Sequence, residues 1–133
     1  MRKKENQFSL SLRFKSVLHA VGGLGDMLFT EHNAWIHALA TVLALDFAWW
    51  LGIDRYGFAL IIIAIVIVWT AEAFNTVLEI MADLVVRQRY SKIVKRAKDI
   101  AAAGVLIAVL GAIGVGIAVL GPPLCQRLAP WFT

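Results

Sequence analysis

The stretch GFALIIIAIVIVWTAEAFNTVLEIMAD, residues 57–83, is apolar in its first half and acidic in its second. Residues 57–71 carry no charge and, as a helix rising about 1.5 Å per residue, cover about 22 Å. The hydrocarbon core of a bilayer is about 30 Å thick. Glu72, the first charged residue, is therefore expected near the membrane boundary, with the helix continuing past the lipid to about residue 86.

Four polar residues of the second half share one face of that helix. At about 100° per residue their positions fall within an arc of roughly 80°. They are Glu72, Asn75, Glu79 and Asp83, here called the acidic stripe. The other flank is apolar and consists of Phe74, Val77, Leu78, Ile80 and Met81. The pattern predicts an ordered acidic face on a helix that emerges from the membrane.

The acidic stripe has two chemical interpretations. In one, it pairs with Arg and Lys of neighbouring helices and only stabilises a bundle. In the other, it is functional, since ionisable residues at membrane depth are costly and usually carry a function. Glu72 and Glu79, two turns apart, are suited to holding a divalent cation through oxygen. With Glu31 on the same membrane side and the basic loop RQRYSKIVKRAKD (87–99), the parts for phosphoryl transfer from a nucleotide to a lipid are present.

Composition indicates the class of protein. The chain has 133 residues, of which 60% are hydrophobic and 17% charged, and its mean hydropathy is +0.75. Soluble chains average about half apolar and about a quarter charged. The net charge of +4 does not indicate nucleic-acid binding, because the basic residues cluster at the ends of apolar runs. We therefore expect a single integral membrane domain, residues 1–133.

Three membrane spans and one interfacial helix are expected. The spans are 33–53, 57–86 and 98–121, the second extending into the cytoplasm. Ahead of them, residues 8–24 mix apolar and polar positions at helical spacing, which predicts an amphipathic helix in the cytoplasmic interface. Gly22, Gly23 and Gly25 are expected to loosen the chain before the first span. The fold class is an all-α membrane protein.

Lysine and arginine predict the orientation. Eleven of the 13 precede the first span or lie between the second and the third: Arg2, Lys3, Lys4, Arg13, Lys15, Arg87, Arg89, Lys92, Lys95, Arg96 and Lys98. Arg55 and Arg127 remain for the other side. The positive-inside rule therefore puts the N-terminus and the 87–98 loop in the cytoplasm.

A set of longer motifs goes beyond these patterns. They are FKSVLHAVGGL (14–24), TEHNAWIHA (30–38), AEAFNTVLEIMADLV (71–85) and AKDIAAAGVLIA (97–108). The E-x-x-N-T-x-x-E-x-x-x-D pattern followed by A-K-D-x-A-A is far more specific than any one of its residues. Over nearly the whole chain, the sequence resembles the small prokaryotic lipid kinases, the diacylglycerol kinase and undecaprenol kinase family. The resemblance implies a homotrimer in the bacterial cytoplasmic (inner) membrane, with active sites between subunits at the cytoplasmic surface.

The resemblance also implies roles for the acidic residues and a need for ATP and Mg²⁺. Glu72 would be the general base that takes the proton from the lipid hydroxyl, and Asn75 would help to position the reacting groups. Glu31 and Glu79 would hold the Mg²⁺ that bridges the ATP phosphates. Each role suits its residue type, because a carboxylate can accept a proton or bind a hard cation.

Lys98 and Asp99 are implied as nucleotide-binding residues, the lysine through a phosphate group. The sequence departs from the family pattern near its start, where Leu12 stands in place of a common arginine and Arg13 follows one position later. A shift of one residue rotates a helical side chain by about 100°. Arg13 is therefore left out of the expected site.

The motif E-x-N-x-x-I-H followed by Ala, residues 31–38, resembles the undecaprenol kinase branch. The expected reaction is ATP-dependent phosphorylation of undecaprenol to undecaprenyl phosphate. The alternative substrate is diacylglycerol, converted to phosphatidic acid by the same mechanism. A different class, a small cation-coupled transporter using Glu72, is disfavoured because transporter sites lie near the bilayer midplane. A catalytically inactive family member is disfavoured because all six implied site residues are present.

Several other residues receive a structural interpretation or none. His19 and His37 are interpreted as interfacial histidines with local hydrogen bonds rather than as ligands. Asp46, within the first span, has no functional interpretation. The third span carries a stripe of mostly small residues, which predicts close helix packing: Gly104, Ala108, Gly111 and Val115.

Overall fold

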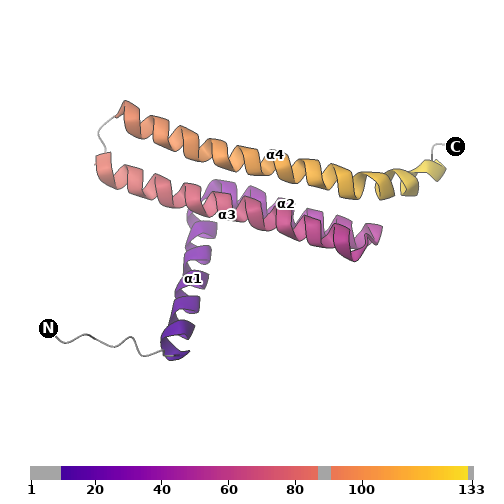
Figure 1. The fold of residues 1–133 in the computed structure, drawn as a ribbon, viewed down its shortest axis with the longest axis horizontal. Coiled ribbons are helices and arrows are strands. Elements are labelled where there is room, and N and C mark those ends of the chain that lie inside the picture. The colour runs from indigo at the N-terminus through magenta and orange to yellow at the C-terminus, as the bar shows by residue number, and fades with distance from the viewer. Residues whose placement is uncertain (1–9, 87–90, 132–133) are drawn as a thin grey trace.

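The computed structural model describes residues 10–86 and 91–131, which form four α-helices and a short 3₁₀ helix (Figure 1). The helices are α1 (Leu10–Thr30), α2 (His32–Leu51), α3 (Arg55–Val86), α4 (Lys92–Leu128) and the 3₁₀ helix η1 (Ala129–Trp131). No strand occurs among these residues, so the predicted all-α class is confirmed. Residues 8 and 9 of the predicted interfacial helix, and Arg87 and Arg89 of the basic loop, lie outside the described residues.

Three of the helices are long and apolar enough to cross a membrane. They are α2, α3, and α4 together with η1. At 32 residues, α3 is about 48 Å long, which exceeds the hydrocarbon thickness of about 30 Å. A helix of this length extends beyond the lipid on at least one side. The chain is therefore a membrane protein with a long second span.

The three spanning helices lie side by side, while α1 leaves them at a steep angle (Figure 1). α4 runs along α3, and α2 packs against both of them. The change of direction occurs at Glu31, whose extended backbone (φ −99°, ψ 117°) separates α1 from α2. The Glu31 N–H still donates to the Met27 carbonyl at 2.9 Å, so the corner is tight. Glu31 is thereby placed where α1 meets the bundle.

Two helices extend past their predicted ends. α1 continues through Gly22, Gly23 and Gly25 to Thr30, so the expectation that these glycines loosen the chain is wrong. Each glycine costs a helix about 1 kcal/mol relative to alanine, and the apolar residues around them still support helical hydrogen bonding. α4 likewise passes through Pro122 and Pro123, whose missing N–H groups do not end it before Leu128.

The turn between α2 and α3 fixes how α3 starts. Gly52 adopts a left-handed conformation (φ 65°) and its N–H caps the carbonyls of the last turn of α2. Asp54 then accepts a hydrogen bond from the Gly57 N–H at 2.8 Å, which caps the first turn of α3. Gly57 is buried against α4, where a Cβ would lie 3.0 Å from Val119 Cγ1. The bare backbone at Gly57 therefore permits close contact between α3 and α4.

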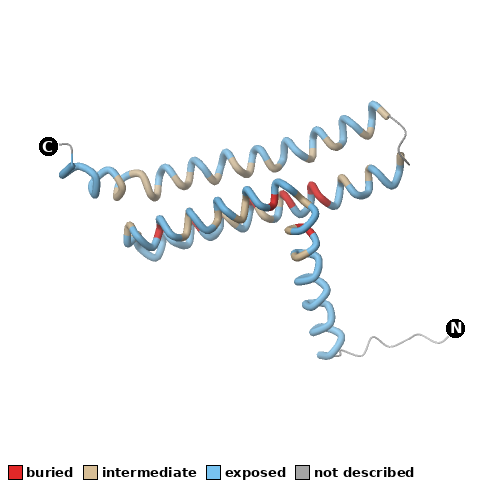
Figure 2. The backbone as a smooth tube through the Cα atoms, turned by 180° about the vertical axis from the view of Figure 1, so that it is seen from behind, coloured by how far each residue is buried: buried red, intermediate tan, exposed pale blue. Residues whose placement is uncertain are grey.

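Few side chains are buried within the described residues (Figure 2). The apolar ones are Met27, Ala34, Ala48, Ile61, Ala64 and Val68. The polar ones are Glu72, Asn75 and Thr76, all on α3. Many large apolar side chains point outward, as on a helix bundle whose surroundings are lipid or other membrane helices. The buried face of α3 is thus apolar in its first half and becomes polar at Glu72.

Gly57→Leu is expected to destabilise the bundle by about 1–3 kcal/mol, because a side chain there must displace Val119 or break the Asp54 cap. Thermal unfolding in detergent measures the change as a lowered Tm. Gly22→Leu is the matched control, since a Cβ at Gly22 meets nothing within 4 Å. Equal Tm values for the two variants would contradict the close packing of α3 on α4.

Candidate functional site

The site is built around Glu72 on α3. Its side chain is only 1% exposed, and it is the largest fully buried side chain among the described residues. Helical spacing puts Glu72 in line with Ile61, Ala64 and Val68, so the carboxylate extends the buried apolar row. Burying an ionisable group without full compensation costs free energy, and proteins usually keep such groups for chemistry.

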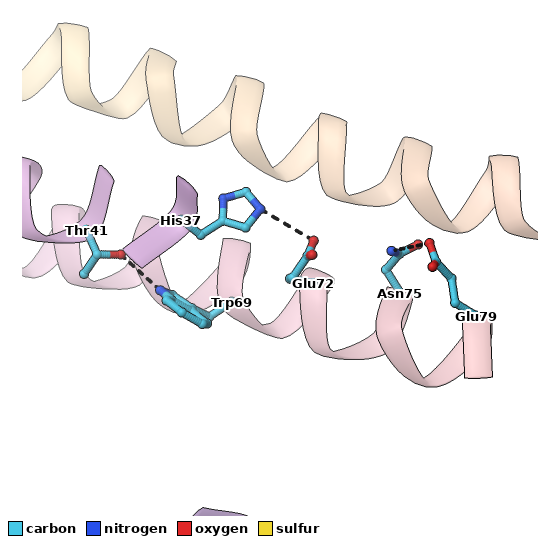
Figure 3. A network of polar contacts seen from close by, with 6 residues as sticks. All are labelled: His37, Thr41, Trp69, Glu72, Asn75 and Glu79. Carbon is cyan, nitrogen blue, oxygen red and sulfur yellow. Dashed lines mark hydrogen bonds and ion pairs between the residues drawn. The ribbon is translucent and has the colours of Figure 1, made fainter. Parts of the chain in front are cut away.

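His37 on α2 faces Glu72. Its Nε2 lies 3.5 Å from Glu72 Oε2, and its side chain is 12% exposed (Figure 3). Oε2 has no hydrogen-bond partner among the described residues. A carboxylate oxygen in this state is able to accept a proton from a hydroxyl group brought next to it.

Asn75 and Glu79 continue the polar face one and two turns further along α3. Asn75 Nδ2 donates to Glu79 Oε1 at 3.1 Å (Figure 3). Asn75 Oδ1 and Thr76 Oγ1 are buried and have no partner among the described residues. Unsatisfied buried oxygens in a native fold call for a ligand, an ion or water. The three side chains therefore offer oxygen atoms to something beyond the chain itself.

A cavity of about 260 Å³ joins Glu72, Asn75 and Glu79. Its polar lining comes from α2 and α3: Asn33, His37, Glu72, Asn75 and Glu79. α4 closes the cavity with the apolar side chains of Ala102, Val105, Leu106 and Val109. A polar wall facing an apolar wall suits a ligand with a polar head and a hydrocarbon body.

Lys98 and Asp99 lie on the first turns of α4, outside the lining of this cavity. Lys98 Nζ donates to Asp83 Oδ1 at 2.9 Å, which joins the end of the acidic stripe to α4. Asp99 accepts from Lys95 Nζ at 2.7 Å, an exposed pair one turn apart on the same helix. Both predicted nucleotide residues are therefore near the open end of the stripe, and each is in an ion pair.

Glu31 is half-buried at the corner between α1 and α2. It does not line the cavity, although Asn33, two residues later, does. The structure thus brings Glu72, Asn75 and Glu79 into one cavity, and leaves Glu31 beside it.

The donor set can be tested against a divalent cation. In the described part of the chain, no group of three or more His, Cys, Asp or Glu side chains is close enough to hold a metal ion. Mg²⁺ does not need such a group, because it keeps several waters and is commonly bound by one or two carboxylates plus substrate phosphates. The Glu79 carboxylate and the unpartnered Asn75 Oδ1 are oxygen donors of the required kind. The residues present fit Mg²⁺ delivered with a nucleotide.

Two polar residues of the cavity lining, Asn33 and His37, are not among the site residues that the sequence predicts. The sequence predicts local hydrogen bonds for His37, whereas its contact in the structure is with Glu72 on another helix. For Asn33 the sequence predicts no role in the site. The signal was available, because residues 33 and 37 are four apart and share a helix face. Which side of α3 that face meets is a matter of tertiary packing.

A buried carboxylate beside a half-polar cavity, on helices long and apolar enough to cross a membrane, is an arrangement typical of the active site of a membrane-embedded enzyme. The sequence profile of the prokaryotic diacylglycerol kinase family matches residues 18–120. The chain therefore belongs to the prokaryotic diacylglycerol kinase family. The family and the names of the relatives indicate a lipid kinase, as the sequence motifs predicted.

Three relatives illustrate the range of the family. The chain is 35% identical to the diacylglycerol kinase of Synechocystis sp. over 113 residues, which cover 85% of this chain and 65% of that protein. It is 27% identical to the undecaprenol kinase of Bacillus subtilis over 124 residues, which cover 93% of this chain and 100% of that protein. It is 32% identical to the diacylglycerol kinase of Escherichia coli K12 over 87 residues, which cover 60% of this chain and 70% of that protein.

Glu72→Gln is expected to leave the free energy of unfolding unchanged or to raise it by about 1 kcal/mol. The reason is that burying a neutral amide costs less free energy than burying a carboxylate. Thermal unfolding in detergent checks this. A loss of more than about 2 kcal/mol would show instead that the contact with His37 holds the bundle together.

Proposed function

We propose that this protein transfers the γ-phosphoryl group of ATP to the hydroxyl group of a membrane lipid alcohol, with undecaprenol as the substrate. The observation that carries the proposal is the buried Glu72 carboxylate, which lines a half-apolar cavity and has one oxygen, Oε2, without a hydrogen-bond partner among the described residues. A lipid hydroxyl is a poor nucleophile until a base removes its proton, and that base must be reachable from the membrane.

Glu72 acts as the general base in this proposal. One oxygen of its carboxylate accepts the proton of the lipid hydroxyl as the lipid oxygen forms a bond to the γ-phosphorus. The bond between the γ-phosphorus and the β–γ bridging oxygen breaks, and ADP leaves with that oxygen. The proton stays on Glu72 until solvent takes it up. The apolar wall of α4 keeps water away from the lipid oxygen, which limits ATP hydrolysis.

The remaining polar residues hold the nucleotide. Asn75 and Glu79, together with Glu31 from the nearby corner, bind Mg²⁺ and position the phosphates. Mg²⁺ held by these residues would offset the charge of the phosphate oxygens. Lys98 contacts a phosphate, which requires it to leave Asp83, and Asp99 contributes to nucleotide binding. Exchange of an exposed ion pair costs little, because solvent screens the attraction between its charges.

The substrate assignment follows the motif of residues 31–38, and the Bacillus subtilis undecaprenol kinase, which aligns over its full length, supports it. Diacylglycerol is the second candidate, because the Synechocystis diacylglycerol kinase has the higher identity, although only 65% of its length is covered. No feature of the cavity favours a cation-coupled transporter, since the stripe continues beyond Glu72 to Asp83.

The assembly and location belong to the same proposal. The protein lies in the bacterial cytoplasmic membrane with its N-terminus inside, which puts the acidic stripe on the side where ATP is present. Three copies form the homotrimer through helix faces such as Gly104, Ala108 and Gly111 on α4. These small residues allow close approach of a neighbouring helix, since no atom lies within 4 Å of a Cβ added at Gly104 or Gly111.

Transfer of labelled phosphate from ATP tests the proposal, with undecaprenol and diacylglycerol offered separately in one detergent system. Wild-type protein is expected to phosphorylate undecaprenol faster, and Glu72→Gln to lose at least about 100-fold in rate because the base is gone. Asp46→Asn is the matched control, since it removes an exposed carboxylate from α2 far from the cavity lining.

Faster transfer to diacylglycerol would keep the mechanism and overturn the substrate. Absence of transfer to either lipid from folded protein, or an equal loss of rate in Asp46→Asn, would contradict the proposed function.

A further inference from the structure

The contact between His37 and Glu72 bridges two helices inside the protein. The imidazole extends from α2 toward the carboxylate on α3 (Figure 3). Nε2 and Oε2 are 3.5 Å apart, and the two side chains are 12% and 1% exposed. This distance is slightly longer than a hydrogen bond and short enough for a direct polar contact between the imidazole and the carboxylate.

The other walls of the cavity offer Glu72 no comparable neighbour. On α3, Asn75 and Glu79 are hydrogen-bonded to each other. The residues of α4 that line the cavity are all apolar. Lys98, the lysine of α4 that is closest to them in sequence, is paired with Asp83. Of the described residues that line the cavity, His37 is therefore the basic side chain that faces Glu72.

We propose that His37 is a positioning residue for the reaction, an inference that rests on the proposed function. Nε2–H donates to one oxygen of Glu72 and fixes the rotamer of the carboxylate, so that the other oxygen is directed at the lipid hydroxyl. A carboxylate on a flexible side chain loses rate when it samples unproductive orientations, and a base held by a second residue does not. Contacts of this kind are commonly long without substrate and shorten in the loaded enzyme.

A purely structural role for His37 would be to hold α2 against α3. A second polar contact joins α2 to α3 about one turn away from Glu72. Trp69 Nε1 donates to Thr41 Oγ1 at 3.0 Å (Figure 3). Thr41→Val removes that contact with almost no change of side-chain volume, so it is the matched control for His37.

The experiment measures kcat and KM for MgATP in proteoliposomes that contain undecaprenol. His37→Ala is expected to lower kcat about tenfold or more and to change KM less than about twofold, because orientation is lost and nucleotide contacts are kept. His37→Gln, whose amide can donate from a similar position, is expected to recover kcat to within about threefold of wild type. Thr41→Val is expected to lower Tm and to keep kcat within about twofold.

Wild-type kcat in His37→Ala would overturn the inference, and so would equal kcat losses in His37→Ala and Thr41→Val. The double variant His37→Ala/Glu72→Gln gives a second check. A residue acting through Glu72 adds no further loss once Glu72 is Gln, whereas a multiplied loss would overturn the inference.

The same assay separates this inference from the proposed function. Wild-type transfer that is lost in Glu72→Gln supports the function whatever the His37 variants do. Absence of wild-type transfer contradicts both the function and the role of His37.

Discussion

The constraint on which the structure depends is a carboxylate on the buried face of a membrane-crossing helix. Glu72 lies 17 residues after the first residue of α3, about 26 Å along the helix, where the buried face stops being apolar. Its free energy of burial is acceptable there because His37 is close and a cavity lined by polar groups begins. Deeper in the apolar half, the same carboxylate would have neither.

The two ends of the helix bundle carry different polar contacts. At the end beyond Glu72, α3 and α4 are joined by the exposed pair of Asp83 and Lys98. Under the proposed function, a phosphate group replaces Asp83 as the partner of Lys98. At the other end, Arg127 donates to the Trp50 carbonyl at 3.0 Å and its guanidinium lies 4.8 Å from the centre of the Trp50 ring. At one end the exposed Asp83–Lys98 pair is able to separate, and at the other end the Arg127–Trp50 contact holds α4 against α2.

Sequence reasoning reached the all-α class and the acidic stripe, because apolar length and helical spacing depend on local chemistry alone. The resemblance of the longer motifs also indicated the lipid kinase family. The continuations of α1 beyond residue 24 to Thr30 and of α4 past Pro122 were not predicted, because a sequence shows the local cost of glycine and proline but not the surrounding interactions that outweigh it. The His37–Glu72 contact depends on how α2 rotates against α3, which a single sequence does not reveal.

The central claim is that metal-bound nucleotide binds on the acidic stripe next to Glu72. Nuclear magnetic resonance of carbon-13-labelled protein in proteoliposomes, with Mn²⁺ and a non-hydrolysable ATP analogue, tests it directly, since a paramagnetic ion broadens the signals of nearby nuclei. The signals of Asn75 and Glu79 are expected to broaden, and the signal of Asp46 is expected to stay unchanged. Sharp signals from Asn75 and Glu79 in protein that still phosphorylates lipid would contradict it.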